Sequence, residues 1–529
     1  MPPTLDSEIL DLLMRYLAVR SDSGTAHENN SDAFFRESLA GEPYFRAHPE
    51  HLGASAIPGD GPGRSVNWAL VRGRGPGTVV LIHHSDTVGT EDYQELAGCA
   101  RDPEALAAAL RAGGRGLGAE ARADLDSGAF MFGHGGADMK AGGSIQLALV
   151  RRFSRQELPK GNLLVLALPD EENLSAGMRH APALLGQLRE RFGLEYRLMI
   201  NSEPHQRTDP RVGVLSEGSV GKLLPFVHAR GALAHAGQVF SGLNPVSLLG
   251  EIVRRMELNA DFCERSGSEV TPPPTCLFLK DSKDRYDVSM PRSAFACFNL
   301  LTLGRSPGEL LGALEELCRE AAGAVLADLE RNHARYRALR GEPAAALPWQ
   351  VPVRRFEQLA GPGPVQAAGP GRTLAQDTWD TVEALLDRQG ATGPGIVIGF
   401  VPPYYPAVTH AAGTFAPKAA ALAGHLVRYA AAALGQRYAT EQFYPGICDL
   451  SFSSIQGGAE LEAALVPNMP LHGPRYRIPF AEIRENAMPC INIGPWGKDF
   501  HQLAERVHKD DLLVATPLLM VEAIRFMLD

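Results

Sequence analysis

Two histidines and several carboxylates follow short apolar runs of this 529-residue chain, a pattern suited to metal binding. His84 closes the run TVVLIHH, and Asp86 stands two residues later. A histidine can ligate a metal through one ring nitrogen while a nearby carboxylate accepts a hydrogen bond from the other and fixes the tautomer. His83 is a competing ligand, but side chains alternate along a strand, so it points to the other face and we assign it a structural role.

A glycine-rich segment, GHGGADMK, contains Asp138. Its glycines permit a tight backbone ahead of a helix that we expect near Ser144. A carboxylate at this place could bridge two cations about 3.5–4 Å apart, the spacing of co-catalytic metal sites. The alternative is an aspartate that only caps the helix, and that alternative does not explain the glycines that precede it.

Three consecutive acidic residues, Asp170, Glu171 and Glu172, follow the apolar run NLLVLAL and a proline. Adjacent carboxylates repel each other and need a cation or a proton to coexist. One of them could ligate a metal while its neighbour acts as the general base that activates water. Most acidic triplets are solvated loops, but the position directly after an apolar strand favours a functional site.

Two further potential ligands complete the set. Glu203 follows the run YRLMI, and His501 lies in GPWGKDFH after the last apolar run. Mixed histidine and carboxylate ligation suits zinc, with manganese or cobalt as substitutes. The sequence offers no G-x-S-x-G elbow, P-loop or Rossmann fingerprint at a fitting strand–helix junction. We therefore predict a hydrolytic centre with two divalent metal ions, most simply zinc.

The elements that must position these residues form an α/β pattern. Helical stretches, for instance 144–153 and 178–192, separate several of the apolar strands. This alternation predicts a central sheet flanked by helices, and such sheets bind ligands beyond the carboxyl ends of their strands. Residues 222–410 contain strands and helices but no ligand cluster. We predict a discontinuous catalytic domain, 1–221 and 411–529, interrupted by an inserted α+β domain.

Composition excludes several function classes. The net charge is −10 and the acidic excess is spread along the chain, which argues against a nucleic-acid partner. Seven cysteines without a C-x-x-C pair argue against disulfides or a thiolate zinc site and favour a reducing, cytoplasmic location. The N-terminus does not read as a signal peptide, and no run of about 18 apolar residues occurs, so we expect no membrane partner.

In this order, the motifs resemble the metallopeptidase family of acetylornithine deacetylase, succinyl-diaminopimelate desuccinylase and glutamate carboxypeptidase. The family's H-x-D, G-x-G-x-x-D-M-K, D-E-E, E-P and K-D-x-H segments span nearly the whole chain. NSEPH, PPPTCL, FVPPYYP and FYPGICDLSF also resemble a member that serves arginine utilisation. The resemblance implies a zinc-peptidase-like fold, hydrolysis of a small amide or short peptide such as an N-acyl amino acid, and a homodimer formed through the inserted domain, which would also be a lid.

The resemblance assigns the metal ligands. Asp138 would bridge the two ions, His84 and Glu203 would complete one site, and Glu172 and His501 the other. The peptide bond after Asp138 would be cis, as it often is in the family.

The resemblance also assigns residues to the substrate and the reaction. Glu171 would be the general base, and Asp86 would orient the neighbouring metal-binding histidine. His235, in GALAHAG, matches a lid histidine that steadies the oxyanion in the partner subunit, although an ordinary loop histidine is an equal alternative. Asn244, in GLNPV, matches a position near the substrate carboxylate. Ser451 occupies the place where better-known members carry an arginine that holds that carboxylate, so carboxylate recognition by this route is in doubt.

Two other functions remain open at this stage. The chain could be a catalytically silent, amino-acid-binding relative, but the complete ligand set with Glu171 argues against the loss of activity. It could also use the metals to hydrolyse a ureido or guanidino C–N bond, since Ser451 leaves the substrate undefined.

Overall fold

The computed structural model describes residues 4–113, 117–155, 160–359, 372–410, 415–473 and 475–529. They form two compact units. The larger unit comprises Met1–Ser219, Val408–Ile455 and Pro479–Asp529, and the smaller unit comprises Val220–Ala407 and Gln456–Ile478. The larger unit is thus assembled from three separate stretches of chain.

An eight-stranded sheet forms the centre of the larger unit, in the order β1-β2-β5-β3-β6-β16-β7-β15. β3, β5, β6 and β16 run parallel to one another. The middle of β3 and nearly all of β5 consist of buried apolar residues, as expected of strands covered on both faces. In the order of the sheet, from β1 to β15, the strands span Leu52–Ala56, Ser65–Val71, Asn162–Leu168, Gly77–His84, Glu195–Asn201, Cys490–Asn492, Val212–Ser216 and Arg437–Glu441.

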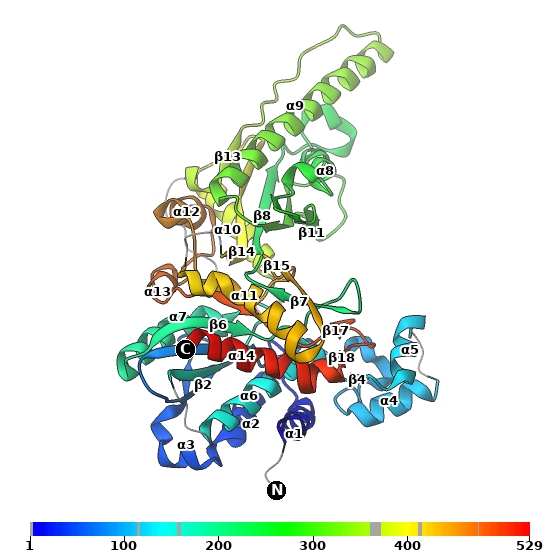
Figure 1. The fold of residues 1–529 in the computed structure, drawn as a ribbon. Helices are drawn as coiled ribbons and strands as arrows, with labels where there is room; N and C mark the ends of the chain where they lie inside the picture. The colour runs from blue at the N-terminus through cyan, green and yellow to red at the C-terminus, as the bar shows by residue number, and fades with distance from the viewer. Residues whose placement is uncertain (1–3, 114–116, 156–159, 360–371, 411–414, 474) are drawn as a thin grey trace. The chain divides into compact units, whose positions relative to one another are not determined.

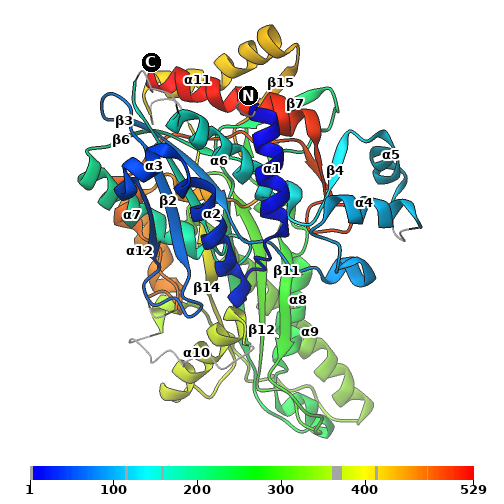
Figure 2. The ribbon, with the colours of Figure 1, turned by 90° about the horizontal axis from the view of Figure 1, so that it is seen from below.

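Helices cover both faces of this sheet (Figure 1). Four helices of 13 or 14 residues share one core with the shorter α2 (Asn30–Ala40) and α3 (Pro43–Ala47) and with alternate strand residues, and α7 packs against β2 and β5. Figure 2 shows two of the four, α1 and α6, side by side. The predicted α/β class, a central sheet flanked by helices, is therefore confirmed. The four helices are α1 (Leu5–Ala18), α6 (Ala141–Ser154), α11 (Pro417–Tyr429) and α14 (Thr516–Leu528), and α7 spans Ala176–Phe192.

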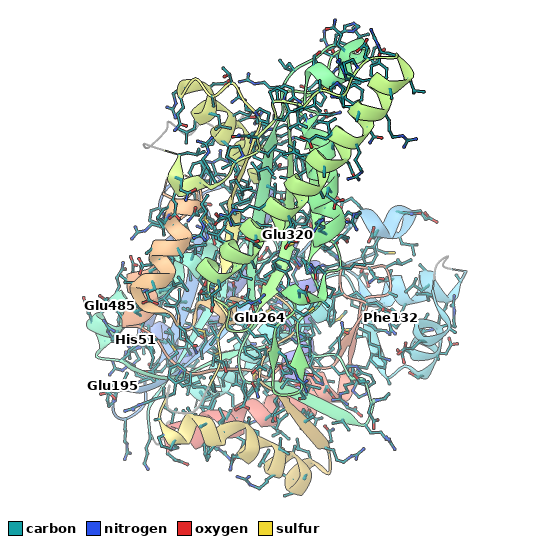
Figure 3. The ribbon with its side chains drawn as sticks, turned by 90° about the horizontal axis from the view of Figure 1, so that it is seen from above. His51, Phe132, Glu195, Glu264, Glu320 and Glu485 are labelled. Carbon is teal, nitrogen blue, oxygen red and sulfur yellow. The ribbon has the colours of Figure 1, made fainter. Side chains whose placement is uncertain are left out.

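A small three-stranded sheet, in the order β17-β18-β4, adjoins a separate apolar core of the larger unit. Phe132 of β4, labelled in Figure 3, is buried in this core together with residues of α4 and α5. The loop between β17 and β18 contains His501, so this sheet holds a predicted ligand. The elements are β4 (Phe130–Phe132), β17 (Gly497–Lys498), β18 (Arg506–His508), α4 (Pro103–Arg111) and α5 (Ala119–Ser127).

The smaller unit contains a five-stranded sheet, in the order β11-β12-β8-β14-β13. α10 packs on one face, where Trp379 stacks on Phe295, and α8 packs on β8 and β12 with α9 beside it. In the order of the sheet, from β11 to β13, the strands span Thr275–Asp281, Ser293–Thr302, Gly221–Arg230, Gly395–Tyr405 and Val353–Arg355. The helices are α8 (Pro245–Met256), α9 (Pro307–Leu339) and α10 (Leu374–Arg388).

The smaller unit also takes in residues that we expected in the catalytic piece 411–529. Gln456–Ile478 belongs to it, because α12 (Gly458–Leu465) packs against α9 with Leu461 and Leu465 buried. A short apolar helix carries no local sign of the unit it will join, so the boundary at 411 missed this second crossing.

None of the described helices combines the length and the apolar composition that crossing a membrane requires. All seven cysteines are free thiols.

Candidate metal centre

Three parallel strands bring three of the five predicted ligands to one edge of the sheet. His84 ends β3 and lies opposite Leu168, the last residue of β5, so the acidic triplet begins beside it. Ile82 of β3 lies opposite Asn201 of β6, which places Glu203 near the same level. The register of adjacent parallel strands therefore gathers residues that are far apart in sequence, as the strand-end rule predicts.

Asp138 lies between the two predicted histidine ligands. Its Oδ1 is 2.9 Å from Nε2 of His84, and its Oδ2 is 3.1 Å from Nε2 of His501. Glu203 Oε1 is 3.7 Å from His84 Nε2, and Glu172 Oε1 is 3.0 Å from His501 Nε2. One carboxylate thus has an oxygen toward each of two histidine–glutamate pairs, which is the arrangement a ligand shared by two cations needs.

The donor atoms are also close enough together for metal binding. Ligand atoms of His84, Asp138 and Glu172 lie within 4.8 Å of one another, and so do those of His84, Glu171 and Glu203. The side chain of His84 is fully buried, whereas that of His501 is 46% exposed. The centre therefore has a closed side and a side that solvent reaches.

Electrostatics keep protons on this cluster in the absence of metal. Burial raises the pKa of Glu171 and of Glu203 well above the ordinary value, and neighbouring carboxylates add to the effect. Burial alone would lower the pKa of His84, but Glu203 and Asp138 hold it well above its usual range. Hydrogen bonds to Asp138 and Glu172 raise the pKa of His501 to about 11. Divalent cations would take the place of these protons.

Asp86 has a different contact from the one predicted. His84 Nδ1 lies 3.0 Å from the Asp86 carbonyl oxygen, whereas the carboxylate is 3.7 Å away. The carboxylate instead accepts the backbone N–H groups of Glu171 and Glu172, at 3.1 and 3.2 Å. The turn after β3 presents the main chain of Asp86 to the ring, so its carbonyl fixes the histidine tautomer and its side chain fixes the acidic turn.

Asp170 begins that acidic turn in a left-handed backbone conformation, with φ 72°. Its carboxylate accepts hydrogen bonds from the Arg64 guanidinium and, at 3.1 Å, from the N–H of Ala176. Arg64 is itself buried and also pairs with Asp60 at 2.7 Å and Glu28 at 3.2 Å. Sequence reasoning missed this network, because nothing local links a loop arginine to a strand end a hundred residues away.

Glu505 is a second residue that sequence reasoning missed. Its buried carboxylate accepts N–H groups from Gly135, Ala137 and Asp138 at 3.0, 2.9 and 3.1 Å. It thereby fixes the glycine-rich loop that presents the shared aspartate. The peptide bond between Asp138 and Met139 is cis, as predicted. In the sequence, the feature that could have pointed to Glu505 is its position, four residues after the predicted ligand His501.

The loop of His501 is held from the α5 side. Asp499 and His501 both have positive φ, 52° and 61°. Buried Arg506 binds the Asp499 carboxylate, the Ala504 carbonyl at 2.9 Å and the Asp124 carboxylate of α5 at 2.7 Å. Residues of α5 therefore determine where this exposed ligand lies.

The three remaining predicted site residues belong to neither group of close ligand atoms. His235 is exposed in the smaller unit, where its Nδ1 accepts the N–H of Gly237 at 3.0 Å. Asn244, also in the smaller unit, caps α8 by accepting the N–H of Val246 at 3.0 Å. Ser451 is buried in the larger unit, with its hydroxyl 3.1 Å from that of Ser219. Their predicted roles stay predictions.

Comparisons with known proteins agree with this geometry. The chain is 32% identical over 518 residues to the uncharacterized protein YqjN of Bacillus subtilis, covering 95% of this chain and 93% of the relative. It is 29% identical over 530 residues to protein RocB of the same organism, covering 95% and 92%.

Solved structures share the fold at low identity. Aminopeptidase PepT from Bacillus cereus matches with a TM-score of 0.52 and 13% identity over 99% of both chains. The di-peptidase Dug1p from Saccharomyces cerevisiae matches with a TM-score of 0.52 and 12% identity over 99% of this chain and 96% of that one. The model of peptidase family M20/M25/M40 matches residues 115–527. The predicted family resemblance is thus confirmed, and the chain belongs to peptidase family M20/M25/M40, whose members are hydrolases.

Proposed function

We propose that this protein hydrolyses an amide bond of a short peptide or an N-acyl amino acid at a centre of two divalent metal ions. The observation that carries the proposal is the position of Asp138, with one oxygen toward His84 and the other toward His501. Glu203 would complete the first site and Glu172 the second. Zinc fits these nitrogen and oxygen donors, and manganese or cobalt fits them as well.

The residues present fit such ions. Nδ1 of His84 faces the carbonyl oxygen of Asp86, which leaves Nε2 as the nitrogen available to a metal. The carboxylates share protons without metal, and cations would stabilise them in ionised form. When bound, two divalent ions supply Lewis-acid chemistry, because they acidify water and polarise an amide carbonyl.

Glu171 is the proposed general base. Asp86 fixes the backbone on both sides of it, and burial raises its pKa well above that of a free glutamate. A base of this kind can take a proton from water near neutral pH and deliver it to the departing amine. Its neighbour Glu172 instead faces His501, so the two glutamates divide the roles of base and ligand.

The smaller unit supports a proposed homodimer. β11 is an edge strand of its sheet, and Leu277 and Leu279 on that strand are 56% and 57% exposed. An exposed apolar edge strand is a surface that a second copy can extend or cover. We propose that the dimer forms through this unit, that the unit acts as a lid, and that His235 assists the oxyanion of the partner's site. Sedimentation of the wild type and of a Leu277→Glu, Leu279→Glu variant tests this assembly, and a monomeric wild type would contradict it.

The substrate class remains broad. The motif resemblance suggests a role in arginine or amino-acid catabolism, and the free cysteines favour a cytoplasmic location. Ser451 in place of the family's arginine keeps a ureido or guanidino C–N bond as a second candidate. Parallel assays on N-acyl amino acids, dipeptides and ureido compounds separate the two bond types.

The first experiment combines metal analysis with a variant of the base. Protein purified without chelator should contain close to two transition metal ions per chain. Glu171→Gln should keep both ions and lose turnover by about 10²–10⁴-fold, the contribution of a general base. Glu522→Gln, on α14, is a matched control that should behave as wild type. No bound metal after addition of zinc or manganese, or a Glu171→Gln variant with the wild-type rate, would contradict the proposal.

A further inference from the structure

Asp449 is a buried carboxylate that the proposed mechanism does not use. It begins a short 3₁₀ helix, η9 (Asp449–Phe452), and is 2% exposed. Neither of its oxygens has a hydrogen-bond partner among the described residues. Burial raises the pKa of this carboxyl to about 7, and the nearby Ser175 side chain offsets only part of that rise.

The other buried carboxylates around the centre differ from Asp449 in this respect. Asp86 accepts two backbone N–H groups, Asp170 binds the Arg64 guanidinium, and Glu505 accepts three backbone N–H groups. Buried polar groups in folded proteins are nearly always paired, and an isolated buried charge is costly. An unpaired carboxylate beside a reaction centre therefore indicates a partner that arrives from outside the chain.

Asp449 lies next to the reacting groups, because the 3₁₀ helix that it begins packs against β3 and β6, which lead to His84 and Glu203, and against α7, which follows the acidic turn. Its charge raises the pKa of the proposed base Glu171 and of the proposed ligand Glu203, and the charge of His84 acts on it in turn. It does not belong to either group of close ligand atoms. Metal ions held by those groups would balance the charges of their own ligands. The carboxylate of Asp449 would then still be available to accept hydrogen bonds from another cation.

The chain around Asp449 offers no positive charge to that carboxylate. In the segment GICDLSF, residues 446–452, Asp449 is the single charged residue, and Ser451 stands where the resemblance leads one to expect an arginine. A negative group in the substrate would be repelled at this place, whereas a positive one would gain charge-assisted hydrogen bonds.

We propose that Asp449 binds a cationic group of the substrate, an ammonium or a guanidinium, close to the scissile amide. This inference rests on the proposed hydrolase function and narrows its substrates. The cation could be the free α-ammonium of a dipeptide, which lies one carbon from the scissile carbonyl, or it could belong to a basic side chain.

Matched substrate pairs test the proposal on the metal-loaded enzyme. Glycyl-leucine and N-acetyl-leucine differ only in the α-ammonium. Nα-acetyl-lysine and N-acetyl-norleucine differ essentially only in the side-chain ammonium. In at least one pair, the wild type should prefer the cationic member by about tenfold or more in kcat/KM, as one charge-assisted hydrogen bond predicts. The pair that responds identifies the source of the cation.

The isosteric variant Asp449→Asn should abolish this preference and leave hydrolysis of the neutral member within about threefold. Asp209→Asn, at a half-buried aspartate of the larger unit, is the matched control and should keep the preference. Should Asp449→Asn fail to fold, as thermal unfolding would show, Asp449→Ser serves in its place. Equal losses for both members of a pair would mean that Asp449 only supports the metal centre, and a wild type without preference would overturn the proposal.

A failure of the hydrolase function gives a different result. If the metal-loaded protein cleaves none of these compounds, calorimetric affinities for lysine and norleucine, and for glycinamide and acetamide, replace the rates. Tighter binding of the cation that depends on Asp449 would sustain the subsite without the proposed reaction. Equal affinities within both pairs would overturn the subsite.

Discussion

Replacing Glu505 with glutamine should weaken metal binding through the loop that presents Asp138. In the wild type, one carboxylate oxygen accepts the N–H of Gly135 and the other accepts those of Ala137 and Asp138. Glutamine keeps one acceptor oxygen and places an NH₂ group against the remaining donor. In the better orientation, the oxygen faces Ala137 and Asp138, and the N–H of Gly135 loses its partner.

The size of the effect follows from that single lost acceptor. A buried N–H without a partner costs about 1–3 kcal/mol. At about 1.4 kcal/mol per factor of ten, this corresponds to a roughly 5–150-fold loss of metal affinity if the cost falls on the loop geometry that the metals need. Burial and the charge of Asp138 raise the pKa of Glu505 to about 8. Below that pH the metal-free carboxyl is protonated and resembles glutamine, so the difference from wild type should widen between pH 7 and pH 9.

Competition with a chelator, measured at both pH values, gives the affinities. Glu522→Gln is the control, because its partner His425 lies on the surface helices and not at the centre. Glu505→Asp should not restore the affinity, since a side chain one carbon shorter cannot reach all three donors. An unchanged metal affinity together with a lower unfolding temperature would show that Glu505 acts only on stability, and would refute the reasoning.

Three further predictions concern the same centre. His501→Ala should reduce the metal content from two ions to one by elemental analysis, because Asp138 and Glu172 are left without a nitrogen donor, and retention of two ions would contradict the ligand assignment. Since the pKa of His501 is about 11 without metal, and that of His84 is also raised, cations must displace protons at neutral pH. The apparent affinity should therefore rise by at least about tenfold per pH unit between pH 6 and pH 8, and calorimetry in buffers of different ionisation enthalpy should detect the released protons. A metal affinity that does not change with pH would contradict the assignment of the histidine ligands. Arg64→Met leaves Glu28 and Asp170 buried without their cation and should lower the free energy of unfolding by about 3–5 kcal/mol in urea titrations; a loss below about 1 kcal/mol would show that the network does not depend on this arginine.

That these side chains lie close together could be predicted, because most of them stand within a few residues of the end of an apolar strand or in a glycine-rich turn. His84 ends β3, and Glu172 and Glu203 follow the ends of the neighbouring parallel strands β5 and β6. The positions of the apolar runs along the chain are enough to predict this. The same local rule predicts the α/β class. Asp138 was recognisable because glycines stood before it and a helix after it.

The residues that hold the cluster in place could not be predicted in this way. Glu505 bonds to N–H groups more than 360 residues away, and Arg64 to a carboxylate more than 100 residues away. No local pattern records such a pairing. The spacing of His84 and Asp86 did indicate a contact, but it could not show that the carbonyl, and not the carboxylate, would face the ring.

The position of β16 has a consequence for how the protein is made. β16 lies between β6 and β7 in the central sheet, yet about 290 residues separate it from the end of β6 at Asn201. At ribosomal rates of about 5–20 residues per second, this interval takes roughly 15–60 s. Throughout that time the apolar edge of β6 lacks its parallel neighbour, which makes it a segment for chaperones to protect. His501 emerges later still, so the nascent chain cannot complete the proposed two-metal site before its last strands are synthesised.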